Sequence, residues 1–309
     1  YLRSNLSVSV DSSERAAWMN STRAQACDAA RVVLPAATTS TVGIVASAQT
    51  VEHLILHLAA EGLEECQRVA KSILREARNV AAPFFKRTDM PERGGATVAY
   101  KINKKEAIKR LVKARLPRTS RHAGRLVEYP SIILLDYWPD DELELVPEML
   151  FAESNLSLND LTWEIAEWSE EQKEEIFRAY IGERLNRRHK PGRAIEKAHY
   201  QWEIVGDYGT FRDLQRHRMV DQWEWQRLMP YYGYEVPILV KEAGFETQFH
   251  RCFELSETLF ESIEKAGFQE EAQYATLLGH RMRYRFITNA TEAFHMLELR
   301  TQLQGHPGY

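Results

Sequence analysis

The chain has 309 residues, of which 44% are hydrophobic and 27% are charged, a balance typical of a soluble globular protein with a substantial core. Its formal net charge of −4 gives no nucleic-acid signature for the whole chain, and the absence of any run of about 18 apolar residues argues against a transmembrane helix. Cys27, Cys66 and Cys252 lie far apart without a CxxC pair, which argues against a disulfide framework or a thiolate zinc site and favours a cytoplasmic protein.

Apolar residues at helical spacing predict three helices near the start of the chain, over residues 12–33, 48–60 and 62–82. Between the first two, residues 41–45 (TVGIV) form a short apolar run, which predicts a buried strand. Residues 87–95 are polar and contain proline and glycine, so they predict a linker.

Two blocks of opposite charge follow. Residues 101–125 are rich in Lys and Arg, and residues 136–153 are rich in Asp and Glu. We favour two solvated helices that could pack together over an anion-binding or RNA-binding module, because such blocks are more often surface than site.

The second half of the chain alternates predicted strands and helices. We expect strands over residues 131–137, 198–205 and 282–288, and helices over residues 140–152, 168–187, 207–218, 246–266 and 290–303. The predicted fold is therefore α+β, with a mixed, mainly antiparallel sheet and long helices.

One pattern occurs twice. A helix, a helix-breaking turn, a strand and a second helix follow one another over residues 28–60 and again over residues 272–303. Such self-similarity suggests an internal duplication, although helix–strand–helix is also a common order.

The most unusual segment spans residues 207–237. Its first part gathers cationic or potentially cationic groups, and guanidinium groups suit phosphates and carboxylates. Its second part is aromatic and could stack on a flat heterocycle. The segment therefore predicts a site for a phosphorylated planar ligand, and the alternative is a surface helix end with Arg–Asp pairs followed by an aromatic core. The groups in question are Arg212, Arg216, His217 and Arg218, then Trp223, Trp225, Tyr231, Tyr232 and Tyr234.

Arg216-His217-Arg218 resembles the RHR signature of the flavin-dependent thymidylate synthases (ThyX). Glu196, before a predicted strand, and Glu224, after the signature, stand where that family has acidic residues. Residues 289–300 (NATEAFHMLELR) resemble the family's N-x-R…LNLR segment, and residues 31–35 (RVVLP) resemble its R-x-x-L-P segment.

The resemblance covers about residues 20–85 and 128–309 and implies a duplicated, ThyX-like arrangement. Residues 1–90 would be the C-terminal part of a first repeat, residues 91–127 a basic linker or insertion, and residues 128–309 a second repeat. Because the chain begins with Tyr1 and ends at Tyr309 within this pattern, we expect it to be a segment of a longer protein.

The resemblance implies conversion of dUMP to dTMP with methylene-tetrahydrofolate, FAD and NADPH, in which reduced flavin delivers hydride and no protein nucleophile is needed. It also implies a homo-oligomer with composite sites. From the sequence itself we expect no metal, nucleic-acid or membrane partner. The implied cofactor-binding residues are Arg216, His217, Arg218, Glu196, Glu224, Asn289 and His295, and the implied substrate-binding residues are Arg227, Arg300, Arg31 and Asp213.

The chain also departs from the family pattern. Gln226 replaces the Ser of RHR-x7-S, Thr291 replaces the Arg of N-x-R, and Asp213 replaces a Gln before the signature. Two functions therefore stay open: a partial or divergent thymidylate synthase, or a non-catalytic domain that binds FAD or nucleotide or forms an oligomer.

Overall fold

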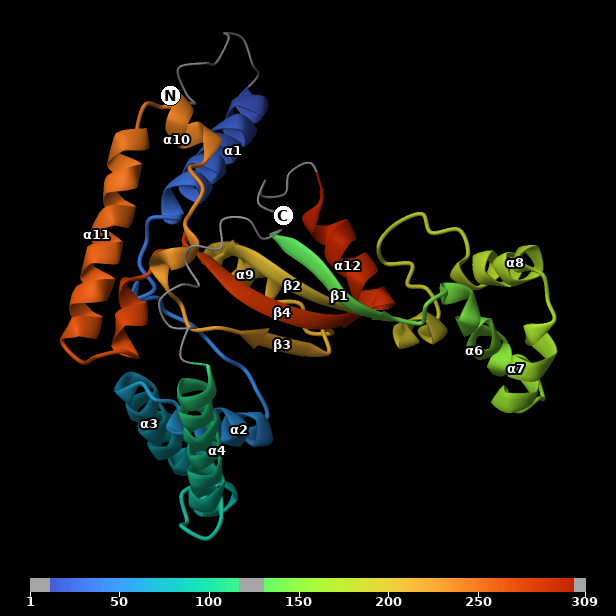
Figure 1. The fold of residues 1–309 in the computed structure, drawn as a ribbon, viewed down its shortest axis with the longest axis horizontal. Coiled ribbons are helices and arrows are strands. Elements are labelled where there is room, and N and C mark those ends of the chain that lie inside the picture. Colours follow the sequence, from blue (N-terminus) through green and yellow to red (C-terminus); the bar gives the residue numbers. More distant parts are fainter. Residues whose placement is uncertain (1–11, 117–130, 303–309) are drawn as a thin grey trace. The chain divides into compact units, whose positions relative to one another are not determined.

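The computed structural model describes residues 12–116 and 131–302 (Figure 1). The chain divides into two compact units: unit 1 comprises residues 1–34, 127–256 and 276–309, and unit 2 comprises residues 35–126 and 257–275. In the described part of the chain, none of the helices combines the length and apolar character needed to cross a bilayer.

Unit 1 is built on a four-stranded antiparallel sheet with the order β1-β2-β4-β3 (Figure 1). Three strands, β1 (Ile132–Trp138), β2 (His199–Asp207) and β4 (Arg281–Asn289), confirm strands predicted from the sequence. The fourth, β3 (Gln222–Trp225), was not predicted and lies within the arginine-rich and aromatic segment. The mixed helical and antiparallel architecture confirms the predicted α+β class.

The two faces of this sheet differ because side chains alternate along each strand. On one face, Tyr284 and Phe286 of β4 pack with Phe211 of α9 (Tyr208–Leu214), and Met296 of α12 (Ala290–Arg300) joins this cluster. The opposite face carries ion pairs between neighbouring strands, including Arg283–Glu203 at 3.2 Å. The apolar face therefore anchors α9 and α12.

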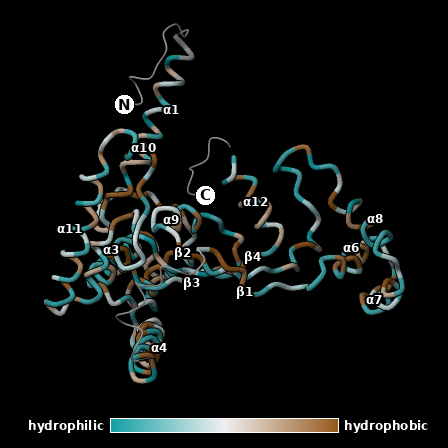
Figure 2. Tube along the Cα trace, turned by 45° about the horizontal axis from the view of Figure 1, so that its top comes forward, coloured by the Kyte–Doolittle hydropathy of each residue, from teal (hydrophilic) through white to brown (hydrophobic). Residues whose placement is uncertain are grey.

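A second core cluster of unit 1 lies where α12 begins. It contains Val146, Leu161, Ile195 and Ala290, contributed by several short helices. Figure 2 shows hydrophobic residues gathered where α6 and α7 pack together. The helices around the cluster are η3 (Glu142–Leu145), α6 (Val146–Phe151), α7 (Leu158–Ala166), α8 (Glu170–Ile181) and η4 (Arg193–Lys197).

The helix predicted over residues 168–187 is α8, and it ends earlier than predicted. Gly182 follows it at φ +66°, a conformation that favours glycine and cannot continue a right-handed helix. Residues after Gly182 are therefore free to leave the helix axis.

The N-terminal segment completes unit 1. After α1 (Ser12–Arg31), the carbonyl of Val32 accepts from the backbone N–H of Gly279 at 2.7 Å. A Cβ on Gly279 would lie 2.9 Å from the ring of Phe253, so this close approach requires glycine. The remaining elements are η5 (Pro230–Tyr232), α10 (Ile238–Glu242) and the first part of α11 (Glu246–Lys265).

Unit 2 is helical. Its core contains Ile55, Ala70, Leu74 and Phe85, which bring together α2 and α3 and the turn that follows them. The predicted helices over residues 48–60 and 62–82 are confirmed as α2 (Ala48–Ala59) and α3 (Glu64–Ala81), followed by η1 (Phe84–Arg87), α4 (Gly94–Arg115) and, after α11, η6 (Glu271–Ala275).

The strand predicted over residues 41–45 is wrong. These residues form no helix or strand, and Val42, Ile44 and Val45 are 73%, 67% and 104% exposed. Five apolar residues do not make a strand without a neighbouring strand to hydrogen-bond. The helix–strand–helix order that suggested duplication is therefore absent at residues 28–60, and the division into repeats stays a prediction.

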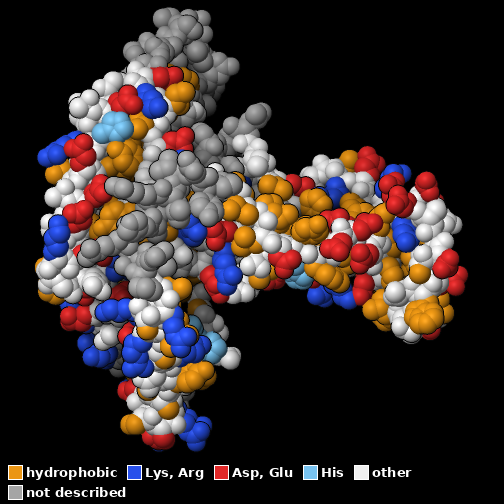
Figure 3. All heavy atoms as spheres, in the orientation of Figure 1, with side chains coloured by type: hydrophobic (Ala, Val, Ile, Leu, Met, Phe, Trp, Pro, Cys, Tyr) orange, Lys and Arg blue, Asp and Glu red, His pale blue; other side chains and the backbone are white. Residues whose placement is uncertain are grey.

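The basic block belongs largely to α4, over which Lys and Arg side chains gather (Figure 3). Lys105 pairs with Glu61 and Lys109 with Glu270, each at 2.8 Å and both within unit 2. The helix interpretation is confirmed for Gly94–Arg115, and residues 117–125 of the block lie outside the described part of the chain.

Candidate functional site

A cavity of about 560 Å³ opens in unit 1 along α12. Three stretches of chain form its walls: residues 184–191, which follow α8; residues 216–219, which follow α9; and residues 291–300 of α12. Its size lies within the range of small-molecule sites. Of the residues implied by the family resemblance, Arg216, His217, Arg218, His295 and Arg300 line it.

His217 forms the buried centre of this site. Its Nδ1 lies 2.6 Å from Oε1 of Glu292, and both side chains are only 2% exposed. On the other side of the ring, Nε of Arg300 donates to Nε2 of His217 at 3.1 Å. Since Nε2 accepts this bond, the proton must be on Nδ1, which donates to the Glu292 carboxylate.

Burial lowers the pKa of His217 below its ordinary value, although the neighbouring Glu292 opposes this shift. Arg300 and His295 lower the pKa further. The ring is therefore neutral near pH 7, in agreement with the tautomer that its two hydrogen bonds require.

Asp213 links the cations behind the cavity. Its carboxylate pairs with Arg216 at 3.0 Å and with Arg31 at 3.4 Å, and its backbone carbonyl accepts from Nη2 of Arg300 at 2.7 Å. Arg31 and Asp213 thus join the network that holds the predicted cations, without lining the cavity themselves.

Asn289 supports the site through the backbone. It is the N-cap of α12, and its Oδ1 accepts from the backbone N–H of Glu292 at 2.9 Å. This bond satisfies one of the unpaired N–H groups at the helix start and sets the first turn, which carries Thr291 and Glu292.

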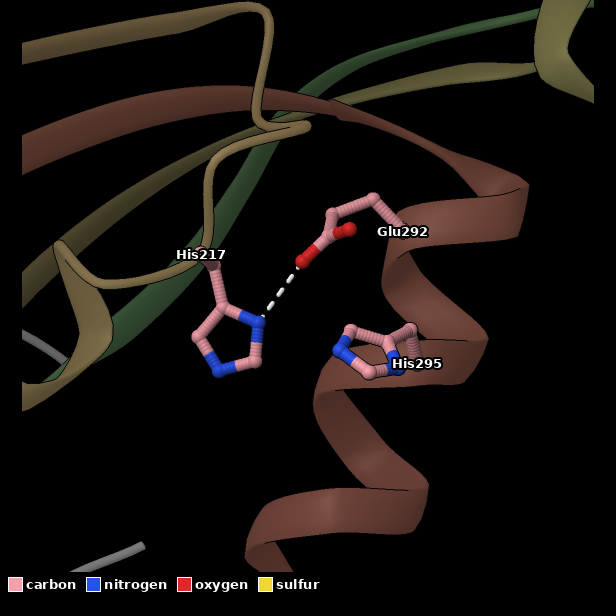
Figure 4. A group of neighbouring side chains, drawn as sticks. All are labelled: His217, Glu292 and His295. Atoms are coloured by element: carbon pink, nitrogen blue, oxygen red, sulfur yellow. Dashed lines mark hydrogen bonds and ion pairs between the residues drawn. The ribbon is translucent and has the colours of Figure 1, made fainter. Parts of the chain in front are cut away.

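His217, Glu292 and His295 also bring possible metal ligands together, with ligand atoms within 4.8 Å of one another. In Figure 4, Glu292 and His295 project from the same helix toward His217, and only Glu292 bonds to it. Both nitrogens of His217 are already engaged, and six Lys or Arg side chains line the cavity against two Glu. Because cations repel a metal ion, this arrangement suits an anion better.

Six predicted site residues lie outside the described lining of the cavity: Arg31, Asp213 and Asn289, described above, and Glu196, Glu224 and Arg227. Glu196 pairs with Arg193 at 3.3 Å, and Glu224 bonds Arg285 at 2.6 Å. Glu224 points away from Phe211, since its strand neighbour Trp223 packs on that ring. Arg227 lies two residues after the end of β3. Gln226, where the family has Ser, accepts from the hydroxyl of Tyr232 at 2.9 Å.

The aromatic stretch predicted as a stacking surface packs elsewhere. Trp223 contacts Phe211 and Phe286 in the sheet core, and Tyr234 stacks on Phe253 at 3.7 Å between ring centroids. The aromatic groups along the cavity are instead Phe294 and His295 of α12.

Sequence reasoning missed one entire wall of the cavity and its buried carboxylate. Arg184, Arg187 and Lys190 were assigned to a helix that in fact ends at Gly182. Glu292 could have been found from the sequence. Asn289 followed three residues later by Glu resembles a capping box, a pattern that marks the start of a helix.

Comparisons with known proteins show the family of this chain. Residues 133–308 match the family model described as Thy1, thymidylate synthase complementing protein. The chain is 31% identical over 294 residues to a UPF0159 protein of Chlamydia pneumoniae, covering 95% of this chain and 54% of that protein. It spans about half the length of the curated relatives it matches.

Two solved structures are also similar. A UMP/dUMP methylase, PolB of Streptomyces cacaoi, bound with 5-Br dUMP, is 16% identical with a TM-score of 0.44, over 57% of this chain and 82% of that one. The flavin-dependent thymidylate synthase of Helicobacter pylori, complexed with FAD and dUMP, is 17% identical with a TM-score of 0.38, over 57% of this chain and 87% of that one.

Proposed function

The chain belongs to the thymidylate synthase complementing protein family, and from this premise we propose that its cavity binds the phosphate-bearing ligands of a flavin-dependent thymidylate synthase, FAD and dUMP. The observation that supports this proposal most strongly is the excess of cations around the cavity. Arg216, Arg218 and Arg300 face the same space from two stretches of chain. Guanidinium groups bind phosphates through charge-assisted, often bidentate hydrogen bonds.

The residues fit a phosphorylated planar ligand in a second respect. Phe294 and His295 line the cavity beside the cations, and Phe294 is 39% exposed, so a flat ring could lie against it. When bound, reduced flavin supplies the hydride for methylation of dUMP, with NADPH as reductant and methylene-tetrahydrofolate as carbon donor.

The protein's own residues would orient ligands and balance their charge. Arg216 and Arg218 would bind phosphate oxygens or the anionic edge of the flavin. His217 is already engaged at both nitrogens, so its role would be to hold the guanidinium of Arg300 toward the cavity rather than to bond a ligand.

Titration of the purified protein with FAD tests this proposal. Loss of a charge-assisted hydrogen bond costs about 1.5–3 kcal/mol, so Arg218→Gln should weaken FAD binding roughly tenfold or more. Arg212→Gln is the matched control, because Arg212 lies in the same segment but outside the cavity lining, over the ring of Tyr208. A protein that takes up no FAD, or equal losses in the two variants, would refute the assignment.

A second candidate function is ligand binding without turnover. The substitution of Ser by Gln226, whose side chain is held by Tyr232, favours it for this chain. Formation of dTMP from dUMP, methylene-tetrahydrofolate and NADPH separates the two, because the second candidate predicts FAD binding and no dTMP.

A further inference from the structure

The loop that follows α8 forms one wall of the cavity. Residues 183–190, called the strap below, leave α8 and run beside α12 (Figure 1). Arg184, Arg187 and Lys190 of the strap line the cavity. Every residue of the strap except Arg184 is exposed. A segment with so few buried side chains can open locally at a low cost in free energy.

Both ends of the strap are fixed to α8. At its start, Gly182 ends the helix with φ +66°. At its end, a Cβ on Gly192 would collide with the ring of Tyr180, so the chain passes directly against this side chain of α8. The hydroxyl of Tyr180 also accepts from the backbone N–H of Ala194 at 3.0 Å. The strap is therefore a surface loop whose two ends lie close together.

Hydrogen bonds between its own residues hold the strap in shape. Nδ1 of His189 accepts from the backbone N–H of Leu185 at 3.3 Å, and Oδ1 of Asn186 accepts from the backbone N–H of Arg188 at 2.9 Å. Nε of Arg184 donates to the carbonyl of His189 at 2.6 Å, which joins the start of the strap to its end. Because these bonds are internal, the strap can move as one body.

One ion pair, called the latch below, ties the strap to the facing wall. Nη2 of Arg184 donates to Oε2 of Glu298 on α12 at 2.9 Å, and the guanidinium lies 5.5 Å from the centre of the Phe294 ring. Within residues 12–116 and 131–302, no other residue of the strap forms a hydrogen bond or ion pair outside it. The position of the strap therefore depends on Arg184.

Charge opposes the latch while the cavity is empty. Arg187 and Lys190 line a cavity whose other walls carry three further arginines. Like charges repel one another, so this repulsion favours a strap that swings away from the cavity. An anionic ligand between the walls would offset the repulsion and favour the closed position.

We propose that the strap is a gate, held closed by the latch, and that ligands enter and leave the cavity only while the latch is broken. The inference rests on the proposed function, because it assumes that the cavity binds an anionic ligand, and it adds how access to the cavity is controlled. Arg184 and Glu298 are then positioning residues, which act on binding through the strap.

Limited digestion of the full chain with trypsin, without ligand, measures opening of the strap. The peptide bonds after Arg187 and Arg188 lie in the strap, and their rate of cleavage follows the population of the open form. Glu298→Gln weakens a partly exposed ion pair, so cleavage there should be roughly three- to fivefold faster than in the wild type.

Glu254→Gln is the matched control for this digestion. It weakens an ion pair with Arg251, at 3.1 Å on α11, outside the cavity lining. Its strap should be cleaved at the wild-type rate. Equal rates in all three proteins would show that the latch does not hold the strap and would refute the inference.

Stopped-flow binding of FAD tests the gate itself. If FAD passes only through the open form, the rate constants of association and dissociation both scale with the open fraction. Glu298→Gln should therefore raise both by a similar factor and leave the Kd nearly unchanged. A rise in the dissociation rate constant alone would indicate damage to the binding site and contradict a gate.

Thermal unfolding and FAD uptake separate the remaining outcomes. The strap lies outside the two core clusters of unit 1, so Glu298→Gln should unfold at the same temperature as the Glu254→Gln control. A much lower temperature would attribute faster cleavage to unfolding and count against the gate. If the unsubstituted protein takes up no FAD, the proposed function is wrong and the gate with it. If it binds FAD with rate constants that the variant leaves unchanged, only the gate is wrong.

Discussion

The state of a single buried imidazole organises the site. His217 accepts from Arg300 at Nε2 and donates to Glu292 from Nδ1, so these two neighbours together decide which nitrogen carries the proton. The ring is thereby held in one neutral tautomer, hydrogen-bonded on one side to a buried carboxylate and on the other to a guanidinium group at the cavity.

Glu292→Ala should therefore destabilise the protein without changing the tautomer of His217. It removes the acceptor for a buried N–H, which costs about 1–3 kcal/mol, while Arg300 still donates to Nε2 and keeps the proton on Nδ1. Urea unfolding should show the loss of stability, and nitrogen NMR of the histidine ring should still show the Nδ1–H form. Glu292→Gln is the control, because its amide oxygen can still accept from Nδ1–H. An alanine variant as stable as the glutamine variant would contradict this role.

His280 gives a pH dependence that is separate from the cavity. It is 2% exposed, burial lowers its pKa to about 4, and its Nδ1 accepts from the backbone N–H of Leu277. Its folded pKa lies below the value of 6.5 for an unperturbed side chain, so the unfolded state binds the proton more tightly as pH falls. The contribution of neutral His280 to the free energy of unfolding is therefore fully present above pH 6.5 and is lost progressively as the pH falls toward 4.

The loss should reach roughly 3 kcal/mol for a shift of this size. Urea unfolding of the wild type and of His280→Asn across this pH range measures it, and the asparagine variant should show the shallower slope. Since the pKa of His217 is also lowered, part of the slope should survive in the variant. Equal slopes in the two proteins would refute the assignment to His280.

At the level of elements, α12 presents the largest part of the cavity wall, and its start depends on one cap. Asn289→Ala should destabilise the protein by about 1 kcal/mol and weaken FAD binding, because the first turn positions Thr291 and Glu292. Asn289→Ser keeps an oxygen acceptor and should lie close to the wild type in both measurements. If alanine and serine behave alike, the cap does not support the site.

Elements with long periodic patterns could be predicted from the sequence, and short ones that depend on partners could not. The helices α2, α3 and α11 carry amphipathic patterns over three turns or more, which outweigh local exceptions. The strand expected at residues 41–45 had only a five-residue apolar run, and no neighbouring strand stabilises it. The strand β3 is equally short, yet it forms because β4 offers a hydrogen-bonding edge.

The residues of the site also divide into those that the sequence could reveal and those that it could not. Arg216, His217 and Arg218 are adjacent in sequence, so their chemistry was visible as a cluster. Arg187 and Glu292, which line the same cavity, lie on distant stretches of chain that only folding brings together. Local sequence could not reveal those partners.

On the scale of the whole molecule, the predicted composite sites can be tested by mixing variants. Glu224 lies outside the cavity of its own chain, so its implied role would have to be played in the cavity of a second copy. Arg218→Gln and Glu224→Gln should each weaken FAD binding, and mixing them with exchange of subunits should restore part of it. Light scattering should show an oligomer. A mixture that binds no more FAD than its separate components would contradict composite sites.

The position of α12 along the chain has a consequence for biosynthesis. Of the described helices and strands, it is the last to be translated, and it brings Thr291, His295 and Arg300 to the cavity. A nascent chain still lacking this helix cannot close the cavity, and it also lacks Ala290 and Met296, which belong to the two core clusters of unit 1. Completion of the core and closure of the cavity are thereby deferred until this helix has left the ribosome.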